Sequence, residues 1–437
     1  MHRFAANVTW LVALASVAGA AAKPGSPIAI TNVTIIDVAG GAHQSNVSVL
    51  IQAGRIASIG PKIDIPRGAS RLNGKGKFLI PGLWDMHSHH QGTGTGAVDL
   101  FVAKGVVGTR DMGADADFIF PLRAQIQAGE LLGPEIVLSG PMLDDAPAGF
   151  PYRRPTRNAS DARNAVRDLK QLGVDFIKVH DHTPREVFFA IAEEAPKLGL
   201  TFAGHVPSAV TVEEAADAGM RSIEHLANFN VFGDCGTGET VATYSLSGCA
   251  VRFDKLAAKG VWQTPTLAFS QSMPNVFSGA PLDHAEYASD SLLKLTRDNV
   301  QLSHLDSKTL DKFRQANEIT PRAIRDLQAH GNRFLAGCDG LVPGFCLHDE
   351  LEWFTRSGLS PLQALQTATI NPALFLGRQD SQGTIAVGKR GDVVLLDADP
   401  TIDIRNTTRI AAVVIRGKLV DRSTIDRIIT NHRRTIR

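Results

Sequence analysis

Two histidines, His87 and His89, have a spacing that suits the binding of one metal ion. They follow the apolar or turn-forming residues 80–84, and in an extended strand residues two apart project to the same face. Both imidazole rings can therefore reach one cation. A short apolar strand that ends in polar side chains is how an α/β barrel builds a site at the carboxyl ends of its strands, so this stretch predicts part of a metal site.

Other polar side chains end predicted strands further along the chain. They are Lys178, His205, His225 and Asp339. The lysine interrupts the apolar stretch 175–180, where burial of its amine is costly unless something uses the nitrogen. One strand–helix–strand step separates the two histidines, which places them on adjacent strands. Two histidines at equivalent strand ends, together with the earlier pair, are hard to explain by packing alone.

The sequences of these stretches resemble motifs of the amidohydrolase superfamily. Residues 81–89 read P-G-L-W-D-M-H-S-H, which is similar to the Asp-x-His-x-His motif on the first barrel strand of that superfamily, where it binds a divalent metal. Residues 175–179, D-F-I-K-V, are similar to its fourth strand, and residues 336–340, A-G-C-D-G, to its last. The tail at 383–392, G-T-I-A-V-G-K-R-G-D, extends the resemblance over most of the chain.

The resemblance implies a site for two divalent metal ions bridged by a lysine that carbon dioxide has converted to a carbamate. Zinc is the expected metal, since imidazole and carboxylate ligands with an open position suit it. The implied ligands are His87 and His89 for the first ion, His205 and His225 for the second, carboxylated Lys178 as the bridge, and Asp339 on the first ion.

The implied chemistry is hydrolysis. A metal-activated hydroxide would attack a polarised carbonyl while Asp339 takes its proton and later passes it to the leaving amine. Resemblance to prolidase-like, Xaa-carboxypeptidase-like and imidazolonepropionase-like amidohydrolases favours a C–N amide bond in a dipeptide or an N-acyl amino acid. Hydrolysis of a lactone or phosphoester on the same two metals stays an alternative, as does a catalytically silent barrel kept for binding or assembly.

Five further residues are candidates for contact with the substrate: Arg110, Tyr152, Arg153, His180 and His182. Arg110 ends the second strand in a phrase similar to the family's T-x-R-D, where it either supports the site or pairs with Asp111. The tyrosine and the second arginine lie after the third strand, where an arginine either clamps a substrate carboxylate or remains solvated surface charge. The two histidines lie just past Lys178 and would line the pocket.

Strand and helix patterns alternate through the chain and predict an α/β fold. Residues 28–60 carry β-type alternation, and the far end repeats it from Gly391. Between them, strands and helices alternate without a Gly-rich dinucleotide fingerprint. We therefore predict a (β/α)8 TIM-like barrel over 80–376, with a small composite β domain made from 28–79 and 377–425.

Helix start signals recur in the middle of the chain. Thr183 and Thr211 each open a capping-box pattern, and Thr320 and Ser360 each precede a proline that suits the first position of a helix. The connection over residues 266–320 is far longer than a normal barrel loop. Its leucine-rich part indicates helices that either cover the site or form a dimer contact.

Composition limits the partners and the compartment. A formal net charge of +1 over 437 residues gives no support to a nucleic-acid partner, which leaves a small molecule or a dipeptide and keeps a homo-oligomer open. Residues 1–22 read as a signal peptide, with a basic start, a short apolar run and small residues near a cleavage site. Because no later segment is apolar enough to span a membrane, we expect an exported protein, periplasmic or secreted.

Four cysteines fit an oxidising compartment. Cys235 and Cys249 lie fourteen residues apart in a Gly- and Thr-rich insertion, and are expected either to form a local disulfide or to remain two loop thiols. Cys338 and Cys346 flank the predicted site. Pairing between them stays open, but Cys338 has the setting of an ordinary buried strand residue.

Overall fold

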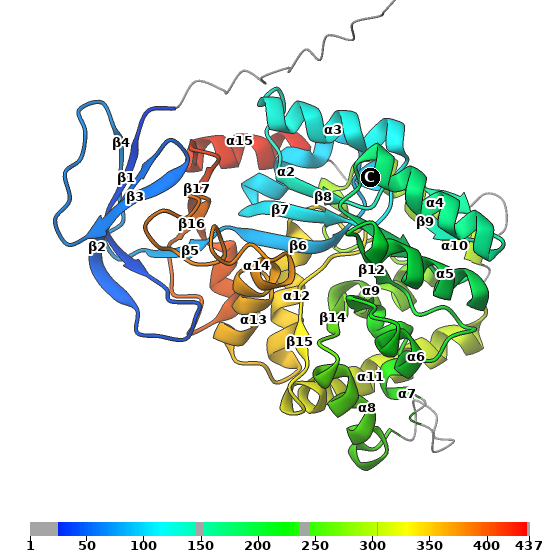
Figure 1. Cartoon of the computed structure of the whole chain (residues 1–437). Helices are drawn as coiled ribbons and strands as arrows, with labels where there is room; N and C mark the ends of the chain where they lie inside the picture. Colours follow the sequence, from blue (N-terminus) through cyan, green and yellow to red (C-terminus); the bar gives the residue numbers. More distant parts are fainter. Residues whose placement is uncertain (1–24, 146–151, 234, 236–243, 304, 435–437) are drawn as a thin grey trace, which may run out of the picture.

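The computed structural model describes residues 25–145, 152–233, 235, 244–303 and 305–434. A β-sheet lies at one end of the molecule and a larger α/β body makes up the rest (Figure 1). β5 (Phe78–Pro81) leads directly into β6 (Leu83–Ser88), the first strand of that body. The predicted signal peptide lies outside the described residues.

Both ends of the chain build the smaller sheet. Its strands in the described residues are β1 (Ile28–Ile35), β2 (Gln44–Gln52), β3 (Arg55–Gly60), β4 (Ser70–Asn73), β5, β16 (Val393–Leu396), β17 (Ile410–Ile415) and β18 (Lys418–Asp421). β5 and β16 pair antiparallel, with Leu79 opposite Leu395. The predicted composite β domain is therefore confirmed.

β16 joins this sheet to the larger body. Its four residues are all buried, and successive side chains of a strand point to opposite faces. Val393 and Leu395 pack in the core of the composite sheet. Val394 and Leu396 pack in the larger core. The strand therefore has no side facing solvent, and it links two hydrophobic cores.

Eight parallel strands surround the larger core in the part of the chain that the structure describes. They are β6, β7 (Val106–Asp111), β8 (Glu135–Leu138), β11 (Phe176–Val179), β12 (Thr201–Gly204), β13 (Ser222–Glu224), β14 (Trp262–Thr264) and β15 (Arg333–Phe334). Asp175 N–H donates to the carbonyl of Leu138 (2.9 Å), which joins β8 to β11. Met86 N–H donates to the carbonyl of Ala336 (2.8 Å), which closes the ring. The predicted (β/α)8 barrel is confirmed.

Helices alternate with the barrel strands and cover their outer side (Figure 1). The α-helices of the described residues are α1 (His90–Thr93), α2 (Val98–Ala103), α3 (Ala116–Ala128), α4 (Ala159–Leu172), α5 (Arg185–Lys197), α6 (Val212–Asp217), α7 (Asn230–Gly233), α8 (Leu246–Ala258), α9 (Leu267–Phe277), α10 (Asp290–Ser303), α11 (Ser307–Ala329), α12 (Phe345–Arg356), α13 (Pro361–Thr367), α14 (Ile370–Phe375) and α15 (Arg422–His432). Two short strands, β9 (Met142–Asp144) and β10 (Arg153–Pro155), follow β8. The long connection before β15 contains α9, α10 and α11, with a short 3-10 helix at Ala285–Tyr287 between the first two.

Two of the four predicted helix starts are confirmed. Thr211 and Ser360 each form a capping box, at α6 and α13. Thr183 does not cap a helix, because its hydroxyl donates to the carbonyl of Leu143 and α5 begins after Pro184. The sequence has the capping pattern, but the Thr183 hydroxyl hydrogen-bonds to Leu143 of β9 instead of to the first turn of α5.

The expected helix start at Thr320 is wrong. α11 continues through Pro321, although a proline removes one N–H from the helix ladder. The carbonyl that loses its donor belongs to Asn317, and the side-chain amide of Gln271 on α9 donates to it instead (3.1 Å). A neighbouring helix therefore supplies the hydrogen bond that the proline cannot.

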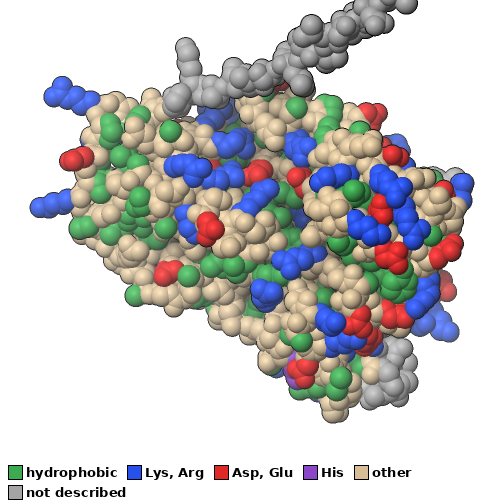
Figure 2. All heavy atoms as spheres, in the orientation of Figure 1, with side chains coloured by type: hydrophobic (Ala, Val, Ile, Leu, Met, Phe, Trp, Pro, Cys, Tyr) green, Lys and Arg blue, Asp and Glu red, His purple; other side chains and the backbone are tan. Residues whose placement is uncertain are grey.

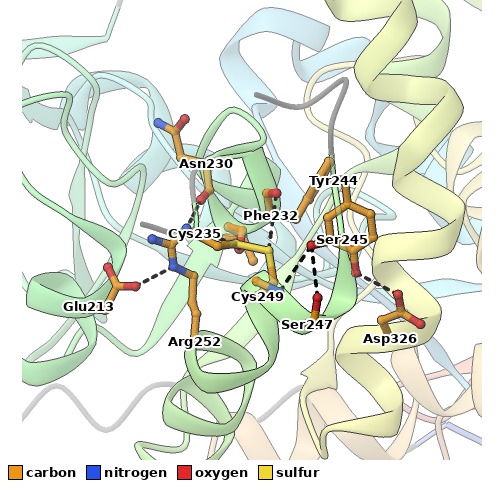
Figure 3. Close-up of a disulfide and its surroundings, with 12 residues drawn as sticks. Glu213, Asn230, Phe232, Cys235, Tyr244, Ser245, Ser247, Cys249, Arg252 and Asp326 are labelled. Atoms are coloured by element: carbon orange, nitrogen blue, oxygen red, sulfur yellow. Dashed lines mark hydrogen bonds and ion pairs between the residues drawn. A yellow bond between two sulfur atoms is a disulfide. The ribbon is translucent and has the colours of Figure 1, made fainter. Parts of the chain in front are cut away.

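The predicted disulfide between Cys235 and Cys249 is present, with a Cα–Cα distance of 5.1 Å. It ties the segment after α7 to α8, beside Arg252 (Figure 3). Arg252 donates to Glu213 (2.5 Å) and to the carbonyl of Asn230 (2.7 Å). The disulfide therefore joins α8 to the segment after α7, and the ion pair joins α8 to α6 (Val212–Asp217).

A second disulfide joins Cys338 to Cys346, with a Cα–Cα distance of 5.7 Å. The expectation that Cys338 is an ordinary buried strand residue is wrong. The turn after β15 contains Gly340 and Gly344 with positive φ angles, and it folds the chain back so that Cys346 at the start of α12 meets Cys338. The bond therefore fastens the turn that follows the last barrel strand.

Side chains of both charges are interspersed over the face drawn in Figure 2. This distribution agrees with the net charge of +1. On that face the basic side chains do not gather into the single stripe that nucleic-acid binding uses. Among the described residues, none of the helices combines the length and the apolar character that a membrane crossing requires.

If β16 links the two cores, Leu395→Ala should lower the free energy of unfolding by about 2–5 kcal/mol, because it leaves a cavity in the composite sheet. Ile402→Ala is the control, since Ile402 is 79% exposed and its truncation should change that free energy by less than about 0.5 kcal/mol. Denaturant titration followed by circular dichroism measures both. Equal midpoints for the two variants would contradict the account of β16.

Candidate active site

Four imidazoles and one carboxylate converge at the carboxyl end of the barrel. They lie near or after the carboxyl ends of β6, β12, β13 and β15, and they are His87, His89, His205, His225 and Asp339. One oxygen of Asp339 lies 3.2 Å from Nε2 of His87 and 3.3 Å from Nε2 of His89. Its other oxygen lies 3.7 Å from Nε2 of His225. The structure thus brings together side chains from strands far apart in the sequence.

Neighbouring acceptors fix the protonation of the first two imidazoles. Nδ1 of His87 lies 2.8 Å from the Glu224 carboxylate. Nδ1 of His89 lies 3.0 Å from the backbone carbonyl of Gly113. Since a carboxylate and a carbonyl can only accept, each Nδ1 carries a proton, and Nε2 is the nitrogen of each ring that faces Asp339. A metal bound between these rings and Asp339 would take the Nε2 atom of each ring as a ligand.

The same argument applies to His225. Its Nδ1 lies 2.6 Å from the hydroxyl of Thr266, and that hydroxyl donates its own proton to the carbonyl of Pro265 (2.7 Å). The hydroxyl oxygen therefore accepts from Nδ1 of His225. Burial holds the pKa of His225 well below its usual range, so the ring is neutral and its Nε2 keeps a lone pair. Histidines that bind metals in proteins commonly have their second nitrogen held in this way.

Lys178 lies in the middle of β11 with its side chain 1% exposed. Its Nζ is buried and has no hydrogen-bond partner among the described residues. Burial lowers the pKa of this amine to about 8, against the opposing effect of the nearby carboxylates. Gly204 on the next strand makes room for it, because a Cβ at that position would lie 2.8 Å from Cδ of Lys178.

His205 and His225 lie on adjacent strands with ring centroids 4.7 Å apart. Nδ1 of His205 lies 2.8 Å from the carboxylate of Asp181. The ring of His180 lies against the other side of His205, with a centroid distance of 4.0 Å. His205 is therefore held between an acidic and an aromatic neighbour at the same end of the barrel.

This donor set fits divalent metal ions. The ligand atoms of His87, His89 and Asp339 all lie within 4.8 Å of one another. Imidazole nitrogens and carboxylate oxygens are the ligands that zinc takes in catalytic sites. The buried Nζ of Lys178 beside this group has no hydrogen-bond partner among the described residues. The residues present are thus suited to hold metal.

Arg110 lies behind the site rather than in it, with its side chain 1% exposed. It donates to the carbonyl of Met86 (2.6 Å), to Glu224 (2.9 Å) and to hydroxyls of β13 and β14. Burial would raise the pKa of Glu224, but Arg110 and His87 hold it well below its usual range. The expected contact of Arg110 with substrate is not supported, because protein acceptors surround its guanidinium.

Asp85 fastens the first strand to the turn after the last. One of its oxygens accepts from the N–H of His87 (3.1 Å) and from the N–H of Cys338 (3.1 Å). Burial raises the pKa of Asp85 to about 7. Gly337 lets the two segments approach, since a Cβ there would lie 2.6 Å from Cβ of His87. These contacts hold the backbone of the turn that carries Asp339.

The site opens into a cavity of about 530 Å³. Of the residues predicted to contact substrate, Tyr152, Arg153 and His180 line this cavity. Arg153 forms an ion pair with Asp144 and a hydrogen bond with His180 (2.9 Å). The side chain of His182 is 51% exposed and lies 3.7 Å from Asp144, at the edge of this group.

An unusual backbone turn follows β13. Residues 225–229 all have positive φ angles between 52° and 72°, although none is glycine. Left-handed backbone costs an ordinary residue about 1–2 kcal/mol, and such residues concentrate at functional sites. The turn places His225 beside Asp339 and Phe229 on the cavity wall.

Glu224 is the main residue that sequence reasoning missed. It lies between Ile223 and His225 in a strand that is fully buried. A carboxylate inside an apolar strand needs a partner of opposite charge or several donors. The position of Glu224 within such a strand could therefore have marked it as a functional residue in the sequence. The structure shows that the partners are Arg110 and His87.

Because Glu224 orients His87, Glu224→Gln should weaken zinc binding by about 10–100-fold. Competition with a chromophoric chelator measures the affinity, and circular dichroism checks that the variant is folded. Glu193→Gln is the control, since that carboxylate is 60% exposed and pairs with Arg163 on the surface. A folded Glu224→Gln protein with unchanged zinc affinity would rule out this role.

Comparisons with known proteins agree with the geometry. A family model described as the amidohydrolase family matches residues 78–420. Adenine deaminase 3 from Rhizobium meliloti (strain 1021) is 24% identical over 410 residues, which cover 91% of this chain and 58% of the deaminase. Ochratoxinase from Aspergillus niger is 23% identical over 426 residues, covering 82% of this chain and 79% of the ochratoxinase. The chain thus spans little more than half the length of the deaminase.

The fold also occurs among solved structures. The crystal structure of a candidate prolidase from Bifidobacterium longum has a TM-score of 0.69 to this chain at 25% identity, and covers 93% of this chain and 99% of its own. The family match runs from β5 into β18 and includes the whole barrel. On this match, the chain belongs to the amidohydrolase family.

Proposed function

We propose that this amidohydrolase binds two divalent metal ions, zinc in the first instance, and hydrolyses a C–N amide bond in a dipeptide or an N-acyl amino acid. Membership of the family supports a metal-dependent hydrolase. Similarity to a candidate prolidase supports a dipeptide-like substrate. The cavity beside the imidazoles has the size of a small-molecule site.

The geometry suggests how the ligands divide between two ions. His87 and His89 would hold the first ion, since one oxygen of Asp339 lies close to Nε2 of both. His205 and His225 would hold the second, since their rings are neighbours on adjacent strands. Asp339 lies between the two groups and would complete the first.

The observation that carries the proposal is the buried amine of Lys178. Its Nζ has no hydrogen-bond partner among the described residues, and burial lowers its pKa to about 8. A neutral amine can add carbon dioxide: its lone pair forms an N–C bond while one C=O π bond of carbon dioxide opens onto oxygen. One proton then passes from the nitrogen to solvent, and the product carries one negative charge on two oxygens. That group would suit the space between two cations.

Bound divalent ions would supply a water of lowered pKa and polarise the substrate carbonyl. Asp339 would accept a proton from a water among the imidazoles, a role supported by the closeness of its oxygens to three of those rings. The same carboxyl group would then pass the proton to the leaving amine nitrogen. Glu224 and Arg110 would keep His87 in one orientation throughout.

We also propose that the protein is exported, as its first residues predict. Both pairs of cysteines, Cys235 with Cys249 and Cys338 with Cys346, are joined as disulfides. Disulfides persist in oxidising compartments and are rare in reducing ones. A periplasmic or secreted location is consistent with these bonds.

Amide hydrolysis can be tested with a panel of N-acetyl amino acids and blocked dipeptides, compared with lactones and phosphotriesters, on protein loaded with zinc in bicarbonate. The amides should react fastest. Asp339→Asn should lower kcat by about 10²- to 10⁴-fold while it keeps more metal than Lys178→Ala. Asp426→Asn, at a carboxylate 54% exposed on α15, should retain full activity.

The other outcomes discriminate between the alternatives. Preferential hydrolysis of lactones or phosphotriesters would replace the amide assignment with the second chemistry. A Lys178→Ala protein with full metal content and full activity would show that the bridge is wrongly assigned. A metal-loaded protein that hydrolyses none of the panel would favour a barrel kept for binding.

A further inference from the structure

The cavity extends from the imidazoles to an apolar wall built by the long connection before β15. α9, α10 and α11 all contribute side chains to it. Phe269 on α9 lies next to the site, with its ring centroid 6.0 Å from that of His225. Further out, Phe229 and Phe313 face each other with centroids 5.9 Å apart. The apolar wall therefore begins beside the ligand candidates and continues outwards.

The wall exposes aromatic surface to the cavity. Phe229, Phe269, Phe277 and Phe313 all line it, and each is only half-buried. Apolar surface in contact with water is unfavourable, and apolar side chains gathered along a cavity usually mark a binding groove. The wall is therefore suited to bind an apolar group.

Charge is distributed unevenly along the cavity. Its ionisable side chains lie at the imidazole end, where the ligand candidates are joined by Tyr152, Arg153, His180 and Asp181. Among the described residues, those that α9, α10 and α11 contribute to the lining are apolar or uncharged, such as Thr296 and Asn299 on α10. A charged group placed there would lose its hydration without gaining a partner.

α10 is held against the mouth of the barrel. Its first turn is fixed by Ser289, whose hydroxyl donates to the carbonyl of Thr93 (2.5 Å). Leu295 lies over the segment that follows the first metal-ligand candidates, since a Cβ on Gly92 would lie 2.6 Å from Cδ2 of Leu295. Leu295 therefore sits where the apolar wall meets the site.

We propose that the substrate carries a large uncharged apolar group, aromatic or long-chain aliphatic, beside the scissile amide, and that the wall of α9, α10 and α11 binds this group. The inference rests on the proposed amide hydrolysis and specifies its substrate class. A cavity of about 530 Å³ has room for such a group together with the amide. Leu295 is the specificity-determining residue at the junction.

The experiment compares N-acetylglycine, N-hexanoylglycine and N-decanoylglycine, with N-succinylglycine as the charged counterpart. The value of kcat/KM should rise by about 3- to 4-fold for each added methylene until the cavity is filled. Leu295→Asp should flatten this dependence and leave N-acetylglycine least affected. Leu302→Asp is the matched control, because Leu302 lies on the same helix but is 43% exposed and should keep the wild-type dependence.

Equal kcat/KM values for the acetyl and decanoyl substrates, or a preference for the succinyl one, would overturn the inference while amide hydrolysis stands. If no amide reacts, the proposed function fails and binding decides the inference. Calorimetry on the zinc-loaded protein, below the micelle concentration, should then show tighter binding of N-decanoylglycine than of N-acetylglycine, with the difference lost in Leu295→Asp. Equal binding of the two would overturn the inference independently.

Discussion

The buried amine of Lys178 is the constraint on which the rest of the site depends. An amine in the interior of a barrel must be paired, neutral or modified, and the described residues offer its Nζ no hydrogen-bond acceptor. Around it, the Nδ1 protons of three imidazoles are already committed to Glu224, Gly113 and Thr266. The Nε2 atoms of these rings all lie close to Asp339, and divalent cations suit such a set of ligands.

A rigid frame behind the site keeps these groups in place. Arg110 and Glu224 form an ion pair that is nearly excluded from solvent and that holds His87. Asp85 connects the first strand to the turn after the last, and the Cys338–Cys346 disulfide fastens that same turn to α12. The ligand candidates therefore belong to a closed barrel in which the first strand is tied to the turn after the last strand. The apolar wall, by contrast, is built from helices added outside the barrel ring.

Structural features that depend on one strand or one turn could be predicted from the sequence. The composite β domain and the barrel follow from the order of local strand and helix patterns along the chain. The group of ligand candidates around His87 follows from short motifs that resemble those of the amidohydrolase superfamily. The roles of Glu224 and Cys338 do not, because their partners lie elsewhere in the chain: Arg110 is 114 residues from Glu224, and Cys346 meets Cys338 only through the turn between them. The continuation of α11 through Pro321 likewise depends on a side chain from α9.

The most direct test of the central claim is the metal content of each chain, measured by elemental analysis on protein produced with zinc and bicarbonate. The account predicts about two zinc equivalents per chain, falling to about one or fewer in Lys178→Ala, since the proposed bridge needs the amine. Two equivalents in both proteins, or none in the wild type, would contradict a metal pair bridged by Lys178.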